Sequence, residues 1–146
     1  MLGELTNQQI ETLLQSECIC RIGCHADGET YVVPVSYAYD GNSFFCHSAD
    51  GLKTHMMRKN PDVCVEVDAM VDLANWRSVI AKARYVELEG DDARKALEFL
   101  VQRLLPIMAS ASSHPMHEQH AQDRRGLKAV AFRLDLKDKT GRYEKR

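Results

Sequence analysis

The sequence lacks an apolar run near the ~20 residues that a membrane-spanning helix needs. Its first residues, MLGELTNQQIETLLQ, lack the basic region and the apolar stretch of a secretion signal. No low-complexity tract is present, and 45% hydrophobic with 27% charged residues is ordinary for a globular protein. We therefore expect a soluble, cytoplasmic protein, folded as a single domain over residues 1–146 without help from disulfides or a structural metal.

Paired metal-ligand spacings are also missing. The five cysteines form no CxxC pair, and most alternate with apolar residues; they are Cys18, Cys20, Cys24, Cys46 and Cys64. Because a zinc site needs paired ligands, we expect reduced thiols packed in the core and no metal site, with a metal or redox role as the less favoured alternative.

An excess of charge of one sign is absent as well. The formal net charge is −2, and basic residues are scattered along the chain. Since a nucleic-acid-binding surface needs clustered positive charge, this distribution argues against a large nucleic-acid footprint. A small-molecule partner is the better expectation.

The sequence contains a series of segments in which apolar and polar residues alternate. Period-two patterns predict six strands, at 18–25, 30–39, 43–48, 62–70, 78–88 and 127–136. The Asp27-Gly28 and Asp40-Gly41 pairs are typical of hairpin turns and would join the first three strands in a meander. Pro34 cannot donate to a ladder, so its strand should be an edge or be bulged there.

Three helices are expected between the strands. Thr6 and Gln9 form a capping-box pattern at the start of the first. The second follows Gly51 and should stop near Asn60, before a proline. The third should begin with Asp91 as its N-cap and kink or end at Pro106. With no βαβ repetition, these elements predict a mainly β fold, a six-stranded antiparallel split β-barrel with helical decorations rather than a doubly wound α/β sheet.

The stretch SFFCHSADGLK combines a strand end, a short loop and a helix start. The free amides of a first helical turn attract anions, and Lys53 adds a positive charge there. Ser48 can donate a hydroxyl, and Gly51 allows close approach of the backbone, so phosphate is the natural guest. Asp50 would repel phosphate unless it caps the helix and points away. An ordinary capped helix with an exposed lysine is the alternative interpretation of these residues.

The wider arrangement resembles a known family. YVVPVSYAYDGNSFFCHSADGLKTHMMRKNPDVCVEVD, followed by NWRSVIAKARYVELEG and a helix, is similar to the pyridoxamine 5′-phosphate oxidase-like family of FMN-binding split barrels. The branch that includes the nitroimidazole-resistance reductases is the most similar part of it. The resemblance extends over 6–141 and rests on the order of several motifs rather than on one signature.

That resemblance implies FMN as the cofactor, bound between the subunits of a homodimer with two sites. The second-strand backbone would lie along the flavin ring, at Pro34, Val35, Ser36 and Tyr37. The third strand end and the following helix would hold the ribityl chain and phosphate, through His47, Ser48, Ala49 and Lys53. The segment that reaches the flavin of the other subunit would be Trp76, Arg77, Ser78 and Val79.

Two departures from the family pattern bear on the substrate. Leu52 stands before Lys53 where the pyridoxamine phosphate oxidases usually have an arginine, so another basic residue such as Arg58, Arg77 or Arg142 would have to help with the phosphate. Their arginine-rich C-terminal substrate-binding segment is also missing. Pyridoxamine phosphate is therefore a poor candidate substrate.

The resemblance favours an NAD(P)H-dependent reductase of a small nitroaromatic or quinone-like acceptor, with neither nucleic acid nor membrane as a partner. His47 is the candidate catalytic residue, as a proton donor or an acceptor-binding group, and simple packing near the barrel mouth is an equally good interpretation. The alternatives are a non-enzymatic flavin- or haem-binding or sensing protein, and a barrel that has lost its cofactor. The histidine-rich segment 110–126 is expected to be a surface loop, which could also act as a lid over a nearby pocket.

Overall fold

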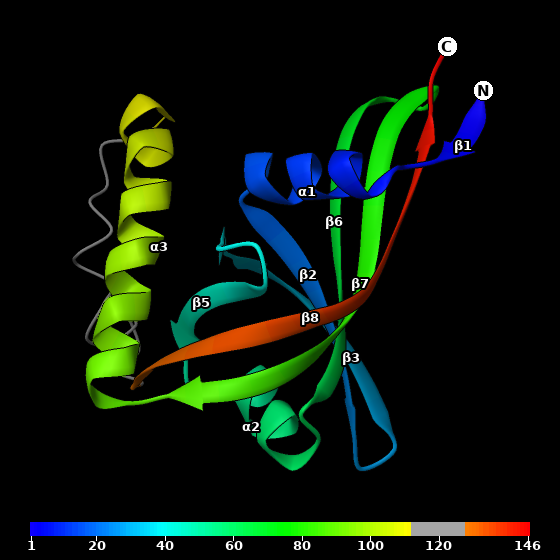
Figure 1. Ribbon diagram of the computed structural model, residues 1–146. Helices are drawn as coiled ribbons and strands as arrows, with labels where there is room; N and C mark the ends of the chain where they lie inside the picture. The colour runs from blue at the N-terminus through cyan, green and yellow to red at the C-terminus, as the bar shows by residue number, and fades with distance from the viewer. Residues whose placement is uncertain (112–127) are drawn as a thin grey trace.

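The structure is a computed structural model that describes residues 1–111 and 128–146. In these residues, eight strands form one antiparallel sheet: β1 (Leu2–Glu4), β2 (Ile19–Ala26), β3 (Glu29–Ser36), β4 (Ala38–Tyr39), β5 (Ser43–Ala49), β6 (Asp62–Asp72), β7 (Asn75–Leu88) and β8 (Ala129–Glu144). Three helices of the described part of the chain pack on it: α1 (Asn7–Ser16), α2 (Leu52–Lys59) and α3 (Gly90–Ala111). Figure 1 shows α3 at one end of the long strands β7 and β8, with α1 and α2 against the body of the sheet.

The prediction of a mainly antiparallel β fold is confirmed, but the predicted count of six strands is wrong. The expected strand 30–39 breaks at Tyr37, whose amide donates to the Cys18 carbonyl rather than to a continuing ladder. The two residues after it pair with β5 instead of β2. The additional short strand β1 pairs with the end of β8.

The sheet runs in the order β3-β2-β6-β7-β8-β5-β4, with β1 attached to β8, and it does not close into a barrel. The predicted three-stranded meander is confirmed only in part: β2 pairs with β3 and β4 pairs with β5, but β3 itself has no ladder with β5, whose other edge pairs with β8. The edge position of the strand that contains Pro34 is confirmed, since β3 ends the sheet. β3 and β5 approach each other without a ladder between them in the described part of the chain, as a split barrel requires.

The core forms where the inward faces of the strands meet α1 and α2. Val63, Val65 and Val67 of β6 are buried, as their alternation predicted. The cysteine prediction is confirmed for Cys20, Cys24 and Cys46, which are buried free thiols, whereas Cys64 is exposed on the other face of β6. Burial is the main cause that raises the pKa of the Cys46 thiol, so it packs as a small apolar residue.

The helices begin largely where their caps predicted. Thr6 and Gln9 form the expected reciprocal capping box, and α2 ends at Lys59 with Asn60 as its C-cap, as predicted. Asp91 lies inside the first turn of α3 rather than before it. α3 also continues through Pro106 to Ala111, so of the two predicted outcomes at Pro106, a kink or an end, the end is wrong. Leu100 and Leu104 before the proline are buried, so packing holds this turn in place.

The last strand is longer than predicted. β8 continues from Leu136 to Glu144, because β7 and then β1 supply backbone partners for the basic tail. Within the described residues, no helix is long and apolar enough to cross a membrane, and no group of three histidine, cysteine or acidic side chains could hold a metal. Most of the histidine-rich segment 110–126, from residue 112 onward, lies outside the described residues.

Candidate functional site

The corner between β5 and α2 is formed as its residue types predict. Gly51 is the N-cap of α2, and a Cβ built there would meet no atom within 4 Å. Lys53 lies in the first turn of the helix and is half-buried. The first-turn amides therefore border open space beside a lysine, which is a suitable arrangement for an anion.

Asp50, the residue that fitted this corner least well, is bound by its neighbours. Its Oδ1 accepts from Thr54 Oγ1 at 2.8 Å and from Arg58 Nη1 at 2.9 Å. These two bonds, the Thr54 bond first, lower the pKa of the Asp50 carboxyl. The carboxylate is thus held by two side chains of α2, and one of them is a guanidinium of opposite charge.

Arg58 links this corner to β7. Its Nε donates to Glu87 Oε1 at 2.7 Å, and the Tyr85 hydroxyl donates to the same oxygen at 2.6 Å. The Arg58 bond is the main cause of the lowered pKa of Glu87. Arg58 therefore forms ion pairs with two carboxylates, and its pair with Glu87 holds α2 against β7.

Glu87→Gln is expected to lower the free energy of unfolding by about 1 kcal/mol at neutral pH, because the partly exposed ion pair is lost. The pKa of Glu87 is lowered in the folded protein, so the ion pair stabilises the fold at pH values above the unfolded-state pKa of about 4.3. This stabilisation is lost as the pH falls through the folded-state pKa. The difference from wild type should shrink below about pH 4 in urea unfolding curves. Glu29→Gln, on the exposed start of β3, is the control. A difference that persists unchanged at low pH would contradict the ion-pair explanation.

β5 separates the predicted site residues into two groups. Its pairing with β8 runs without interruption from Ser43 to Ala49, so successive side chains point to opposite faces. Ser48 shares the face of the buried Cys46, while His47 shares the face of Phe45, which packs toward α3. Only a ligand that lies across the end of β5 can therefore contact both Ser48 and His47.

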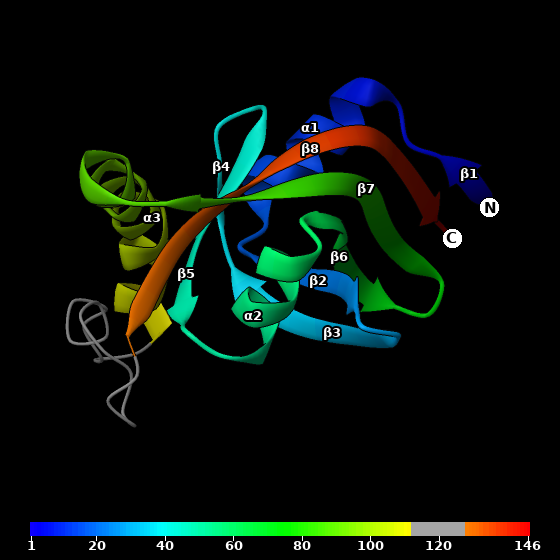
Figure 2. The ribbon, with the colours of Figure 1, turned by 90° about the horizontal axis from the view of Figure 1, so that it is seen from below.

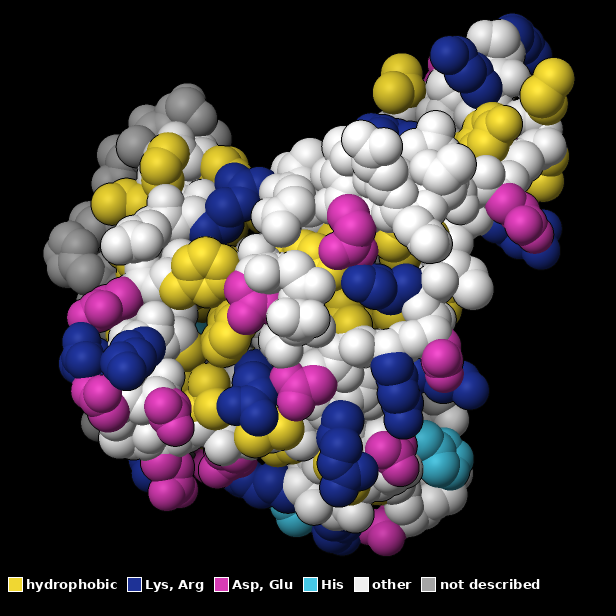
Figure 3. Space-filling view, viewed as in Figure 1, with side chains coloured by type: hydrophobic (Ala, Val, Ile, Leu, Met, Phe, Trp, Pro, Cys, Tyr) yellow, Lys and Arg dark blue, Asp and Glu magenta, His cyan; other side chains and the backbone are white. Residues whose placement is uncertain are grey.

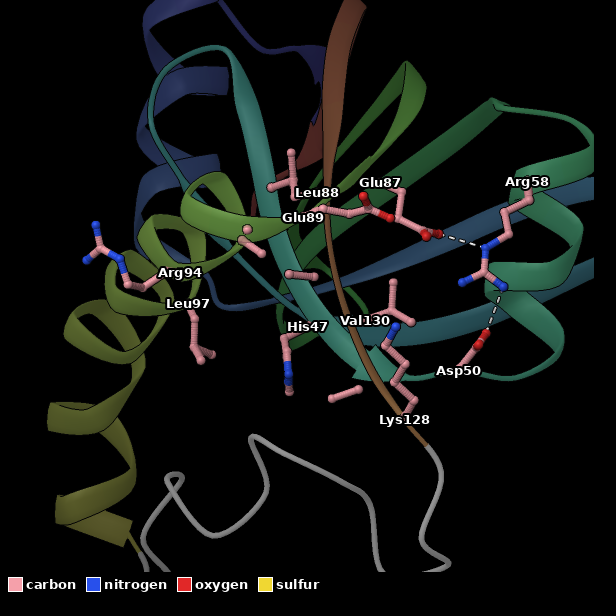
Figure 4. A pocket seen from close by; sticks show the side chains of 14 residues that line it. His47, Asp50, Arg58, Glu87, Leu88, Glu89, Arg94, Leu97, Lys128 and Val130 are labelled. Atoms are coloured by element: carbon pink, nitrogen blue, oxygen red, sulfur yellow. Dashed lines mark hydrogen bonds and ion pairs between the residues drawn. The ribbon is translucent and has the colours of Figure 1, made fainter.

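His47 lines a pocket of about 630 Å³ between β5, β7, β8 and α3. In Figure 4 its imidazole projects into this space, with Leu97 of α3 on one side and Val130 of β8 on the other. Asp50, Arg58 and Glu87 form the wall toward α2, with the two ion pairs drawn as dashed lines. The pocket thus brings His47 beside the ion-pair network but on the other face of β5 from Ser48.

The predicted flavin-ring segment lies on the edge strand. Pro34 and Ser36 are exposed, whereas the side chains of Val35 and Tyr37 are buried. The Tyr37 hydroxyl donates to the Leu14 carbonyl at 2.8 Å, which ties this strand to α1, and burial is the main cause that raises its pKa. Only the backbone and the outward side chains of this segment can meet a ligand.

The third predicted group lies far from His47 within one chain. Trp76 and Arg77 line a second pocket of about 480 Å³ near β1. Val79 is in the core, and the Ser78 hydroxyl donates to Glu66 at 3.0 Å. His47 is level with Leu88 across β8, twelve residues along β7 from Trp76, which is a path of about 40 Å.

Sequence reasoning missed several residues that shape the site. Glu87 of β7, Leu97 of α3 and Lys128, just before β8, line the His47 pocket, and all three are at least 40 residues from His47 in sequence. Arg58 was considered only as a helper for phosphate, not as a partner of Asp50. Glu87 continues the face of β7 that carries the buried Ala83 and Tyr85, but nothing local indicates that it meets Arg58.

The comparisons with known proteins agree with this architecture. An FAD-binding protein of Mesorhizobium loti has a solved structure with a TM-score of 0.78 and 25% identity over 100% of this chain and 98% of its own. A candidate 5-nitroimidazole antibiotic resistance protein of Bacteroides thetaiotaomicron has a TM-score of 0.71 and 17% identity, over 98% of this chain and 87% of its own.

An uncharacterised protein of Rhizobium meliloti (strain 1021) is 31% identical over 84 residues. That match spans 58% of this chain and only 56% of the relative. The sequence model of the pyridoxamine 5′-phosphate oxidase family, in contrast, matches residues 6–143 of this chain. This match extends over nearly the whole sheet and all three helices, and the chain belongs to the pyridoxamine 5′-phosphate oxidase family.

Proposed function

We propose that the chain binds FMN with its phosphate at the β5–α2 corner and, as a cytoplasmic homodimer, acts as an NAD(P)H-dependent reductase of a small nitroaromatic or quinone-like acceptor. The observation that carries this proposal is the corner itself. Lys53 and the first turn of α2 border open space at Gly51, while Asp50 is held by Thr54 and Arg58. Family membership and the FAD-binding relative support a flavin as the ligand.

The residues of the corner fit a phosphate monoester. The Ser48 hydroxyl donates to the neighbouring Ala49 carbonyl at 3.2 Å, a long bond that can be exchanged for one to a ligand. Because Asp50 is paired with Arg58, its repulsion of an anion is reduced, and the positive charge of Lys53 and the helix terminus favours an anion. When bound, FMN would supply hydride acceptance from NAD(P)H and electron transfer to the acceptor.

The homodimer is supported by the separation of the site residues. Because Trp76 and His47 are about 40 Å apart along β7, one ligand could contact both groups only if they came from two copies of the chain. The hairpin between β6 and β7 also exposes large apolar side chains at the projecting end of the molecule (Figure 3). Val71 and Leu73 are each 85% exposed there, and Met70 next to Val71 is 63% exposed. Such a surface is typical of an interface.

His47 is proposed to act on the acceptor. Its imidazole lines the pocket beside α3, where it can donate a proton to an acceptor oxygen as electrons arrive. The overall reaction balances, since NAD(P)H gives up a hydride, one proton comes from solvent through His47, and the acceptor gains two electrons and two protons.

The absorption spectrum of the purified protein, supplemented with FMN, tests this function. We expect flavin bands that bleach when NADH or NADPH is added under anaerobic conditions and return when menadione, a quinone, is added. A Soret band would favour the haem-binding alternative. A protein that takes up no FMN would reject the proposal, and flavin bands that NAD(P)H leaves unchanged would reduce it to flavin binding.

A further inference from the structure

One face of the strands β3, β2, β6 and β7 points away from the core and is open to solvent. Val32 is 62%, Ile80 55% and Ile19 44% exposed on it. The solvated face of an antiparallel sheet is ordinarily polar, so exposed aliphatic side chains on three of these strands indicate a surface that another molecule covers. This outer face consists of the outward side chains of residues 30–36, 19–25, 62–68 and 78–84.

Strand pairing arranges the outer face in rows that run across the sheet. Arg21 of β2 pairs with Pro34 on one side and with Glu66 on the other. Glu66 of β6 in turn pairs with Ile80 of β7. Side chains directly opposite each other in such ladders lie about 5 Å apart. This row therefore has an arginine and a glutamate at its centre and an apolar residue at each end.

The neighbouring row has little side-chain volume at its centre. Gly23 of β2 pairs with Cys64 of β6, and a Cβ built on Gly23 would lie 2.8 Å from Cys64 Sγ. The thiol thus lies over the glycine instead of standing away from the sheet. A second sheet can therefore approach closely here, as packing at the usual separation of about 10 Å requires.

The charges of the outer face balance one another. Three cations and three carboxylates belong to it: Arg21, Lys82, Arg84, Asp62, Glu66 and Asp68. Arg21 Nη1 lies 3.4 Å from both Glu66 Oε1 and Asp68 Oδ2, which is longer than the about 2.8 Å of a close charged pair. A balanced face can meet a copy of itself without net repulsion, and this guanidinium can take a further carboxylate.

We propose that the outer face packs on the outer face of a second copy, about a two-fold axis that runs along the strands between β2 and β6. Such an axis exchanges the two sides of the sheet, so Arg21 lies over the partner's Glu66 and Glu66 over the partner's Arg21. Pro34 meets the partner's Ile80 in the same way, apolar against apolar. The inference rests on the homodimer of the proposed function and identifies the surface through which it forms.

This arrangement agrees with the residues that are proposed to share one flavin. Ser36 pairs with Ile19, and Ser78 pairs with Asp68, so the two serines belong to one row of the outer face. Within one chain they are three strand spacings apart, about 14 Å. The two-fold axis places β3 over the partner's β7, and Ser36 then comes opposite the partner's Ser78.

The size of the face suits a dimer together with the hairpin beside it. Four strands and four rows span roughly 19 by 27 Å. The hairpin between β6 and β7 continues the same surface and exposes Val71 and Leu73. Both areas together approach the ~800 Å² that each partner buries in a stable interface.

Two charge reversals test the face and its register. Arg21→Glu and Glu66→Arg should each weaken the homodimer at least about 100-fold, because each puts like charges opposite one another twice across the interface. A 1:1 mixture of the two variants should dimerise within about tenfold of wild-type affinity, since opposite charges then face each other at both positions. Sedimentation equilibrium measures the affinities. Lys95→Glu, on α3 and outside the outer face, is the control and should stay dimeric. Recovery in the mixture also shows that both variant chains are folded.

Cys64 reports whether the face is covered. It is exposed at the centre of the outer face. Its alkylation by N-ethylmaleimide, followed by peptide mass spectrometry, should be at least tenfold slower in the wild-type dimer than in the Arg21→Glu variant. Cys18, which is partly buried against α3, should react at the same rate in both proteins. Equal rates for Cys64 would place the interface elsewhere and reject the proposal.

The outcomes for this interface and for the proposed function are separable. A dimer that persists in both charge variants, or a mixture of the two that stays monomeric, would reject the interface and leave the homodimer intact. A wild-type chain that is monomeric at micromolar concentration would reject the interface and the homodimer together. Flavin binding would still be decided by the absorption spectrum with added FMN.

Discussion

Lys53→Met is expected to weaken FMN binding by roughly 10- to 100-fold while riboflavin binding stays within about twofold, because a charge-assisted hydrogen bond to phosphate is lost. Riboflavin has the same ring and ribityl chain but no phosphate, so it reports any change in the rest of the site. Quenching of flavin fluorescence in titrations of both ligands measures the two affinities.

Lys59→Met is the matched control, since Lys59 lies at the other end of α2 and pairs with Asp27 at 2.6 Å. It should leave both affinities unchanged. An equal loss for FMN and riboflavin in Lys53→Met would mean that Lys53 supports the fold of the corner, and unchanged FMN affinity would reject it as the phosphate anchor.

A hybrid dimer should recover flavin binding that two separate variants have lost. If Lys53 and Arg77 reach one flavin from different subunits, Lys53→Met and Arg77→Ala homodimers each have two impaired sites. A heterodimer of the two has one unchanged site and one site with both changes, so about half of its sites should bind FMN at wild-type affinity. Co-expression with two affinity tags isolates that heterodimer, and flavin stoichiometry is read from absorbance.

The control is a heterodimer of two differently tagged Lys53→Met chains, which should remain impaired at both sites. If Arg77 instead contacted the flavin bound by its own chain, each site of the mixed heterodimer would carry one of the two changes. Both sites would then remain impaired. No recovery would therefore reject the shared site, and a monomer at micromolar concentration would reject the dimer.

Local residue types predicted the elements of the fold well. The Asp27-Gly28 turn could be predicted because a tight hairpin turn requires positive φ, which aspartate and glycine tolerate best. In the structure the two residues have φ of 53° and 78°. The capping box at Thr6 and the stop at Asn60 depend on contacts within one helical turn. Such features were predictable since the interacting groups are neighbours in the sequence.

The sheet pairing was not predictable in the same way. β5 pairs with β8, and β1 with the end of β8, across most of the chain length. A strand pattern indicates which face is buried but not which strand lies beside it. The same limit explains why the tail after Leu136 was not recognised as a strand.

The candidate site shows what residue patterns alone could not predict. His47 and Ser48 are adjacent in sequence, yet uninterrupted pairing with β8 places them on opposite faces of β5. Asp50 looked unsuitable beside a phosphate because its partner Arg58 and the second carboxylate, Glu87, come from other elements. The charge of a corner is set by these tertiary contacts as well as by the residues that form it.

The two long strands join the ends of the molecule. Figure 2 shows β7 and β8 extending from α3 to the end where β1 lies, with a pronounced bend on the way. A register shift between Ile80 and Lys82 and a positive φ of 52° at Asp138 mark that bend. The irregularity allows one strand pair to border the His47 pocket at one end and the Trp76 pocket at the other.

The length of β7 and β8 therefore sets the distance between the His47 pocket and the Trp76 pocket. Inserting or deleting a single residue on either side of the bend would turn Trp76 or Ala131 to the opposite face of the sheet, because side chains alternate with a period of two. In a homodimer, the same residue count would fix the spacing between the two flavins. We expect length changes between members of this family to fall in loops and in the hairpins, and to leave the span from Trp76 to Leu88 constant.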